Sequence, residues 1–251
     1  MRSVFRFLPV ALAAPLLMLA GCGGGNANTS ESLQGDPVAN VAAAEGTPWT
    51  EVVSKTEEGG YRVGNPDAPI KFVEYGSRSC PACAAFATTG YKPLMENYVA
   101  TGRVSYEFRD FLLHPQDLGV ALLGRCVAKE RFFPMLDQMY VAQPQFNRTA
   151  QGLSQQTLAQ IQSLPAPQAA KMWAQQLGYV DFVKQRGVPQ AQVDQCLSDQ
   201  AAVTELTTML RYASNELGVN STPTFFINGE KVPSGIVWSD IEPQIRAAGA
   251  R

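Results

Sequence analysis

Short segments in which apolar and polar side chains alternate predict β-strands along this chain. The clearest is residues 104–110, where every second side chain is large and apolar. The pair Asn228-Gly229 separates two further short segments and predicts a two-residue hairpin turn. The predicted strands cover residues 61–63 (as a short edge strand), 70–75, 104–110, 224–227 and 230–232.

Apolar residues at helical spacing predict helices between and after these strands. One helix begins at Cys80 and runs to about Ala100, and a mostly helical block covers about 115–217. A last helix covers 240–248, with Ser239 or Asp240 as its N-cap. The order predicts an α/β domain over residues 48–251, with a helical domain inserted at about residues 115–200.

The first 47 residues lack the pattern of apolar side chains that would form part of a folded core. Residues 1–21 combine a basic start with a 13-residue apolar run that is too short to span a bilayer, as in a secretory signal peptide. The signal ends Leu19-Ala20-Gly21-Cys22, which resembles the bacterial lipobox in which the cysteine is acylated; an ordinary signal with a chance cysteine is the alternative. Residues 22–47 are rich in small polar residues and predict a flexible tether.

Composition removes several classes of function. With 20 Lys and Arg against 22 Asp and Glu, the chain has no basic excess for binding nucleic acid. Its single histidine, His114, leaves no basis for a His-based metal cluster or a Ser-His-Asp site. A functional role for His114 stays open, although an isolated histidine is more often a surface or packing residue.

The motif Cys80-Pro81-Ala82-Cys83 carries the chemistry of the chain. It follows a predicted strand and opens a helix, whose N-terminus favours a thiolate, the nucleophile of disulfide exchange. Three-residue spacing lets the two thiols form a disulfide. The alternatives are half of a zinc site or two buried thiols, but zinc needs a second close pair, and Cys126 and Cys196 stand apart.

Two further residues accompany the cysteine motif. Pro223 directly precedes the predicted strand 224–227, where a residue without an N–H needs a special position. Glu74 lies six residues before Cys80, and a carboxylate near a buried thiol can accept its proton. Alternation along the strand leaves open whether Glu74 faces solvent or the core.

Together these motifs resemble those of the DsbA-like thiol:disulfide oxidoreductases. The matching segments are residues 64–69, 72–75, 80–83 and 221–225. The resemblance implies a thioredoxin-like α/β fold with an inserted helical domain. It implies that Cys80 attacks and Cys83 resolves, that Glu74 is the buried acid, and that Thr222 and a cis Pro223 face the substrate.

The resemblance also implies exported substrate proteins with cysteines, a membrane redox partner for recycling, and no cofactor or metal. It places the protein in the periplasm, and the lipobox predicts a membrane anchor through Cys22. Ala82 stands where strongly oxidising members carry a histidine that stabilises the thiolate. Three functions therefore stay open: an oxidase, a reductase or isomerase kept reduced by a membrane donor, and a non-catalytic lipoprotein that binds metal or a partner.

Cys126 and Cys196 both lie on predicted helices of the insertion. If Cys22 is acylated and Cys80 and Cys83 form the redox pair, these two cysteines remain. In an oxidising compartment we expect them to form a structural disulfide. The alternative is two small buried thiols.

Overall fold

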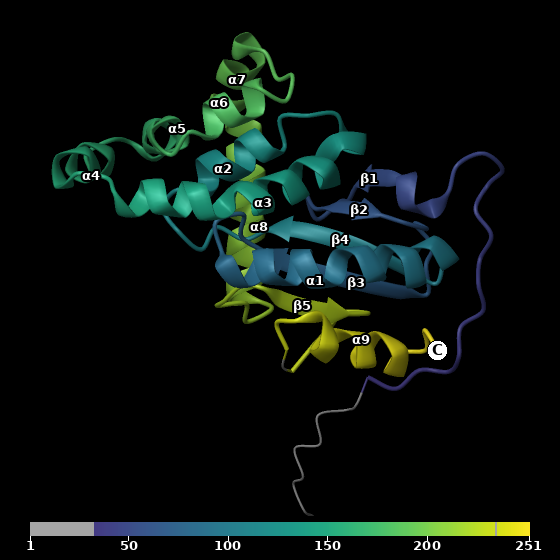
Figure 1. Ribbon diagram of the computed structural model, residues 1–251. Helices are drawn as coiled ribbons and strands as arrows, with labels where there is room; N and C mark the ends of the chain where they lie inside the picture. Colours follow the sequence, from purple (N-terminus) through teal and green to yellow (C-terminus); the bar gives the residue numbers. More distant parts are fainter. Residues whose placement is uncertain (1–32, 234) are drawn as a thin grey trace, which may run out of the picture. The chain divides into compact units, whose positions relative to one another are not determined.

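The computed structural model describes residues 33–233 and 235–251 (Figure 1). The predicted signal peptide, residues 1–21, and the predicted acylation site Cys22 lie outside the described residues. No helix in the part that is described is both long and apolar enough to cross a membrane.

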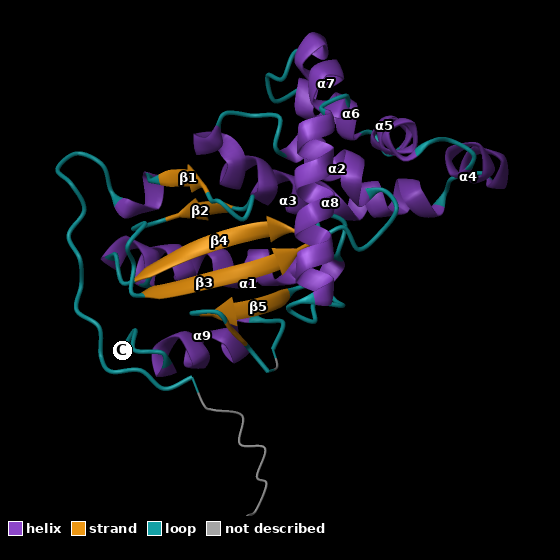
Figure 2. Cartoon of the chain, turned by 180° about the vertical axis from the view of Figure 1, so that it is seen from behind, coloured by secondary structure: helices purple, strands orange, loops and turns teal. Residues whose placement is uncertain are grey.

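A six-stranded mixed sheet forms the centre of the domain, with strand order β1-β2-β4-β3-β5-β6. The central strands β3 and β4 are parallel, and the other neighbours are antiparallel (Figure 2). The strands are β1 (Val53–Lys55), β2 (Tyr61–Val63), β3 (Ile70–Gly76), β4 (Val104–Asp110), β5 (Thr224–Ile227) and β6 (Glu230–Lys231). All predicted strands are present. Residues 61–63 are not the edge strand we expected, however, because β1 pairs outside them.

Helices cover both faces of the sheet. On one face, α1 packs against α3 and α9, and on the other α8 crosses near one end of the strands (Figures 1 and 2). The α-helices are α1 (Pro81–Asn97), α2 (Asp117–Gly124), α3 (Phe132–Gln151), α4 (Gln155–Gln162), α5 (Ala166–Gln176), α6 (Tyr179–Lys184), α7 (Gln190–Leu197), α8 (Gln200–Asn215) and α9 (Trp238–Ala247). Short 3-10 turns are η1 (Trp49–Glu51), η2 (Val99–Thr101) and η3 (Lys129–Arg131). Helices α2 to α7 match the insertion predicted at about residues 115–200.

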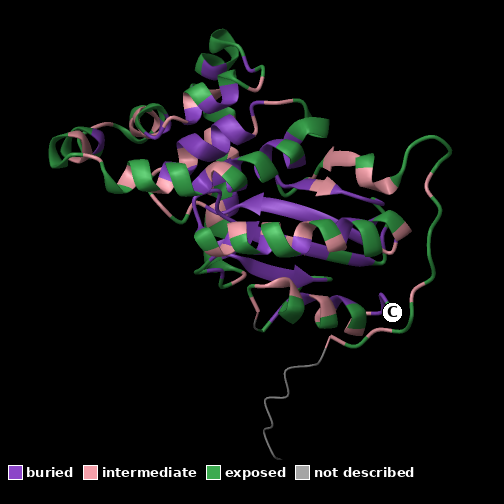
Figure 3. Ribbon diagram, in the orientation of Figure 1, coloured by how far each residue is buried: buried purple, intermediate pink, exposed green. Residues whose placement is uncertain are grey.

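The central strands are buried on both faces, and two apolar clusters result (Figure 3). On the α1 face, Phe72 of β3 stacks on Phe225 of β5 with ring centroids 5.3 Å apart, and Phe86 of α1 contacts both rings. On the α8 face, Tyr75 packs edge-on against Phe226. Burial of this aromatic surface supplies the main driving force for folding around β3.

Part of the predicted flexible tether, residues 22–47, makes backbone hydrogen bonds to the domain. The backbone N–H of Gly35 donates to Ala247 and that of Val38 to Gly249, at the end of α9. The N–H of Val41 donates to Thr101. Composition did not reveal this docking because it depends on backbone groups. The last carbonyls of a helix lack partners within the helix and can accept hydrogen bonds from the backbone of a neighbouring segment.

The last helix also begins earlier than predicted. It starts at Trp238 after Val237, rather than after an N-cap at Ser239 or Asp240. The indole of Trp238 packs against the ring of Tyr98, with centroids 5.8 Å apart. Tertiary packing of this aromatic pair outweighs the local capping preference of a serine or aspartate.

Cys126 and Cys196 form a disulfide between the end of α2 and α7, with Cα atoms 5.9 Å apart. The bond spans 70 residues of sequence and ties the first inserted helix to the last. It closes a loop that contains α3, α4, α5 and α6, and thereby restricts the unfolded chain.

We predict that Cys126→Ala combined with Cys196→Ala lowers the free energy of unfolding by about 4 kcal/mol, the value that chain entropy gives for a loop of this length. Urea unfolding followed by circular dichroism measures the change. The control is Cys80→Ala with Cys83→Ala, which leaves the structural bond intact. Equal stability of the wild type and the Cys126/Cys196 double variant would contradict the prediction.

Candidate active site

The register of three strands brings the predicted site together at one edge of the sheet. Gly76, the last residue of β3, pairs with Asp110, the last residue of the parallel strand β4. Thr224, the first residue of antiparallel β5, pairs with Tyr75. The loops that follow β3 and β4 and the loop that precedes β5 therefore meet at the same edge.

Cys80 occupies the N-cap position of α1, and Pro81 takes the first helical position, where its missing N–H costs nothing. The Sγ of Cys80 lies 3.3 Å from the carbonyl oxygen of Thr222. The contact with the thiol of Cys83 lowers the pKa of Cys80 to about 5, against the opposing effect of burial. Backbone N–H groups in the first turn of the helix act in the same direction.

Cys83 lies one turn further along α1 and is completely buried. Burial raises the pKa of its thiol well above the ordinary value, and the neighbouring Cys80 and Glu74 raise it further. Both cysteines carry free thiols in this structure. Two thiols three residues apart thus differ sharply in their tendency to ionise.

Glu74 faces the α1 side of the sheet, together with Phe72, and is 1% exposed. The hydroxyl of Tyr106 donates to its Oε2 over 2.6 Å, while Oε1 has no partner. Burial raises the pKa of Glu74 to about 8, although the bond from Tyr106 lowers it. The carboxyl therefore lies in the core near Cys83 and holds its proton at neutral pH.

The peptide bond between Thr222 and Pro223 is cis, at the start of β5. The Thr222 carbonyl contacts Cys80, and the Thr222 hydroxyl is buried without a partner. The structure therefore brings together four of the predicted residues around Cys80: Cys83, Glu74, Thr222 and Pro223. The Cys126–Cys196 pair lies apart from them, in the insertion.

A second group of polar side chains beside Cys80 was not predicted. Asp117 is buried at the start of α2 and accepts hydrogen bonds from the hydroxyls of Ser77 and Ser79, over 2.8 and 2.6 Å. The Nδ1 of His114 lies 2.9 Å from the Ser79 hydroxyl. The His114 side chain is 41% exposed, as expected of a surface residue, and the pairing of β3 with β4 also brings its loop to the site.

Arg78, two residues before Cys80, has its guanidinium fully buried. Its Nε donates to Asp110 over 2.7 Å, and Arg125 binds the other oxygen of the same carboxylate over 2.8 Å. A Cβ on Gly124 would overlap the guanidinium, so the close approach of α2 requires glycine there. Gln143 of α3 donates to the carbonyls of Arg78 and Cys80 and fixes the backbone between them.

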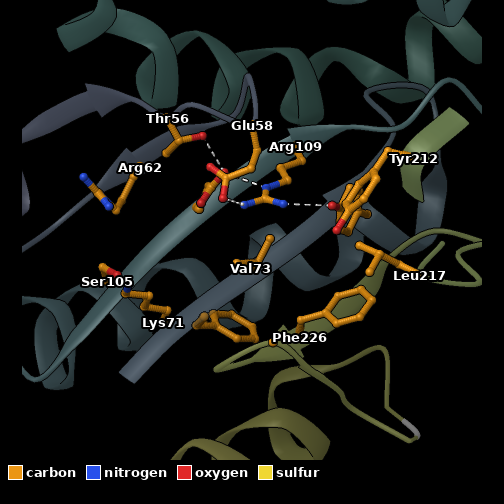
Figure 4. A pocket seen from close by; sticks show the side chains of 14 residues that line it. Thr56, Glu58, Arg62, Lys71, Val73, Ser105, Arg109, Tyr212, Leu217 and Phe226 are labelled. Carbon is orange, nitrogen blue, oxygen red and sulfur yellow. Dashed lines mark hydrogen bonds and ion pairs between the residues drawn. The ribbon is translucent and has the colours of Figure 1, made fainter. Parts of the chain in front are cut away.

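A cavity of about 420 Å³ lies on the opposite face of the sheet from α1 (Figure 4). Among the charged side chains that line it, Arg109 binds Glu107 over 2.6 Å, and it also binds the Tyr75 hydroxyl over 2.9 Å. Among residues 33–233 and 235–251 there is no cluster of three or more His, Cys, Asp or Glu side chains arranged to hold a metal. The reactive groups of the domain therefore lie at the Cys80 edge.

Residues 56–247 match a family model described as thioredoxin. The chain belongs to this family. The cysteine motif at a helix N-terminus, the cis-proline before β5 and the helical insertion after β4 make it a DsbA-like member with a thioredoxin fold.

Solved structures and curated relatives agree with this assignment. The crystal structure of a protein-disulfide isomerase from Novosphingobium aromaticivorans is 28% identical, with a TM-score of 0.71 over 74% of this chain and 95% of that one. The alpha-DsbA1 of Wolbachia pipientis, 24% identical with a TM-score of 0.59 over 76% and 92% of the two chains, shares the fold.

Among curated proteins, a "Putative protein-disulfide oxidoreductase" of Rickettsia bellii is 27% identical over 179 residues. The match covers 71% of this chain and 61% of the relative. The chain thus spans about three fifths of the length of this relative.

We predict that Glu74→Gln flattens the pH dependence of stability. With a pKa of about 8 in the folded state and about 4.5 when unfolded, Glu74 binds an extra proton in the folded state between these pH values. Its contribution to stability is therefore complete below pH 4.5 and is lost as the pH rises to 8, by about 1.4 kcal/mol per unit at most. Glutamine cannot ionise, so this slope disappears.

Urea unfolding at pH 5, 6.5 and 8 measures the slope. The control is Glu96→Gln, because the Glu96 side chain is 62% exposed on α1. If Glu74→Gln retains the wild-type slope, the buried carboxyl is ionised throughout this range and the prediction fails.

Proposed function

We propose that the protein is a thiol:disulfide oxidoreductase that exchanges disulfides with exported proteins through Cys80-Pro81-Ala82-Cys83. The observation that carries this proposal is the asymmetry of the two thiols. Cys80 ionises readily at the start of α1, whereas Cys83 is buried beside Glu74 and retains its proton. Disulfide exchange needs one stable thiolate and one thiol that can be deprotonated when required.

In the oxidising direction, the enzyme begins with a disulfide between Cys80 and Cys83. A substrate thiolate attacks the Sγ of Cys80, a new S–S bond forms, and the bond to Cys83 breaks. Cys83 leaves with the electron pair as a thiolate. The protonated carboxyl of Glu74 can supply the proton that neutralises it.

In the second step, another substrate thiolate attacks the substrate sulfur of the mixed disulfide. The substrate disulfide forms, and Cys80 leaves as a thiolate, which its low pKa makes a good leaving group. The enzyme has then gained two electrons. A membrane redox partner that accepts them would restore the disulfide for the next cycle.

A reductase or isomerase is the second candidate. It is favoured by the similarity to the protein-disulfide isomerase of Novosphingobium aromaticivorans and by alanine, rather than histidine, at position 82. In that direction the Cys80 thiolate attacks a substrate disulfide, and a membrane donor keeps the pair reduced. A reduction potential near about −120 mV favours the oxidase and one near about −270 mV the reductase.

We predict that Cys80→Ser reduces disulfide exchange to the uncatalysed rate, while Cys83→Ser traps a mixed disulfide with the substrate. Without Cys80 no thiolate is exposed to attack, and without Cys83 the mixed disulfide has no internal thiol to resolve it. Oxidation of reduced, unfolded ribonuclease A by the disulfide form of the enzyme measures exchange. For trapping, the Cys80 thiolate of Cys83→Ser attacks a disulfide of scrambled ribonuclease A, and non-reducing electrophoresis detects the covalent complex.

The matched control is Ala85→Ser, at an exposed position of α1, which leaves both cysteine pairs untouched and should retain exchange. Covalent complexes formed by Cys80→Ser through Cys83 would reverse the assigned roles. An inactive wild type that binds Cu or Zn tightly would instead favour a non-catalytic binding protein.

We also propose that the protein is exported and anchored by acylation of Cys22, with residues 1–21 removed. Two or more acyl chains hold a protein stably at a bilayer. Expression in a bacterial host with labelled palmitate tests this: the wild type should incorporate the label and sediment with membranes, and Cys22→Ser should do neither. Label that persists in Cys22→Ser would rule out this anchor.

A further inference from the structure

The imidazole of His114 is held beside the segment that ends in Cys80. Its Nδ1 lies 2.9 Å from the Oγ of Ser79 and 3.6 Å from Oδ2 of Asp117. Ser79 is the immediate neighbour of Cys80 in the chain. The His114 side chain remains 41% exposed, so its protonation can follow the pH of the solvent.

Asp117 fixes this loop from a buried position, with 3% of its side chain exposed. Besides the hydroxyls of Ser77 and Ser79, it accepts hydrogen bonds from the backbone N–H groups of Leu113 and His114, each over 2.8 Å. The loop is therefore held in one conformation, with the imidazole next to the cysteine segment. The hydrogen bond with Asp117 raises the pKa of His114, and the negative charge of a Cys80 thiolate adds to this.

We propose that His114 is a positioning residue for the thiol chemistry: held by Ser79 and Asp117 as an imidazolium, it stabilises the Cys80 thiolate through space. Ala82, between the two cysteines, carries no charge. The cation instead comes from the loop between β4 and α2, at the entrance to the inserted helices. The consequence for redox chemistry rests on the proposed function, but the effect on the Cys80 thiol does not.

A cation beside Cys80 shifts the redox equilibrium in a definite direction. Reduction of the Cys80–Cys83 disulfide takes up two electrons and one proton, which Cys83 receives, and Cys80 remains a thiolate. The imidazolium stabilises this anionic reduced form more than the neutral disulfide, so the disulfide becomes a stronger oxidant. The effect is complete while His114 is protonated and is lost as the pH rises through its pKa.

Other charges around Cys80 are fixed or already balanced. The guanidinium of Arg78 is paired with the carboxylate of Asp110. The titratable groups that face the site from each packed element are Glu74 on β3, Cys83 on α1, Asp117 on α2 and Tyr140 on α3. Burial raises the pKa of Tyr140 and Glu74, so both are protonated at neutral pH. This leaves His114 as the group beside Cys80 whose positive charge changes near neutral pH.

Three variants test the charge separately from the contact. His114→Gln keeps an amide that can bond to Ser79 but has no charge. His114→Lys keeps a positive charge that persists at alkaline pH. Gln116→Ala is the matched control in the same loop, because the Gln116 side chain makes no capping bond to α2.

The pKa of Cys80 is measured from the rate of iodoacetamide alkylation between pH 3 and 9, and the redox equilibrium by titration with glutathione. For His114→Gln we expect the Cys80 pKa to rise by about half a unit to one unit. The equilibrium constant for reduction by glutathione should fall about threefold to tenfold, and tenfold corresponds to about 30 mV. His114→Lys and Gln116→Ala should retain the wild-type pKa of Cys80.

An unchanged Cys80 pKa and potential in His114→Gln would overturn the proposal. The proposal would also fail if the Cys80 pKa and potential changed as much in His114→Lys as in His114→Gln, because charge would then not be the cause. An equal shift of the Cys80 pKa in Gln116→Ala would overturn it too. Both readouts are independent of a protein substrate. If the wild type fails to exchange disulfides with ribonuclease A in either direction while His114→Gln still shifts the pKa, the proposed function fails and this inference stands.

Discussion

The buried ion pair between Arg78 and Asp110 is the constraint on which the site depends. Taking a guanidinium out of water is costly, and here it is offset by the Asp110 carboxylate and by the ring of Phe132, 5.0 Å from the cation. Removing Asp110 would leave the Arg78 guanidinium uncompensated in the core. Since Arg78 lies two residues before Cys80 and Asp110 ends β4, this pair fixes the cysteine segment relative to the central strands.

The pKa values of two buried carboxyls in this core shift in opposite directions, and the difference lies in their neighbours. Burial alone raises the pKa of Asp110, but Arg78 and Arg125 together bring it below its ordinary value. Glu74 has a tyrosine hydroxyl and no cation, so burial dominates and its pKa rises to about 8. One acid is therefore a permanent anion that holds structure, and the other can exchange a proton near neutral pH.

The sequence predicted the features that depend on local pattern. Alternation identified β3 and β4, a short apolar segment identified β5, and helical spacing of apolar residues identified α1. It could not place His114 or Asp117, since their position depends on the flush parallel pairing of Gly76 with Asp110, which periodicity does not specify. One signal was available: loops that follow neighbouring parallel strands meet at the same edge of a sheet, so a histidine four residues after a predicted strand could have been compared with the cysteine motif.

The helical insertion participates directly in building the site. Contacts to residues 77–80 come from the β4–α2 loop and α2, through His114 and Asp117, and from α3, through Gln143. The Cys126–Cys196 bond closes the chain around these helices. Since this bond joins the end of α2 covalently to α7, Asp117 is held by the insertion as well as by the sheet. The geometry around Cys80 therefore depends on two parts of the fold: the register of the central strands and the disulfide-bonded helical insertion.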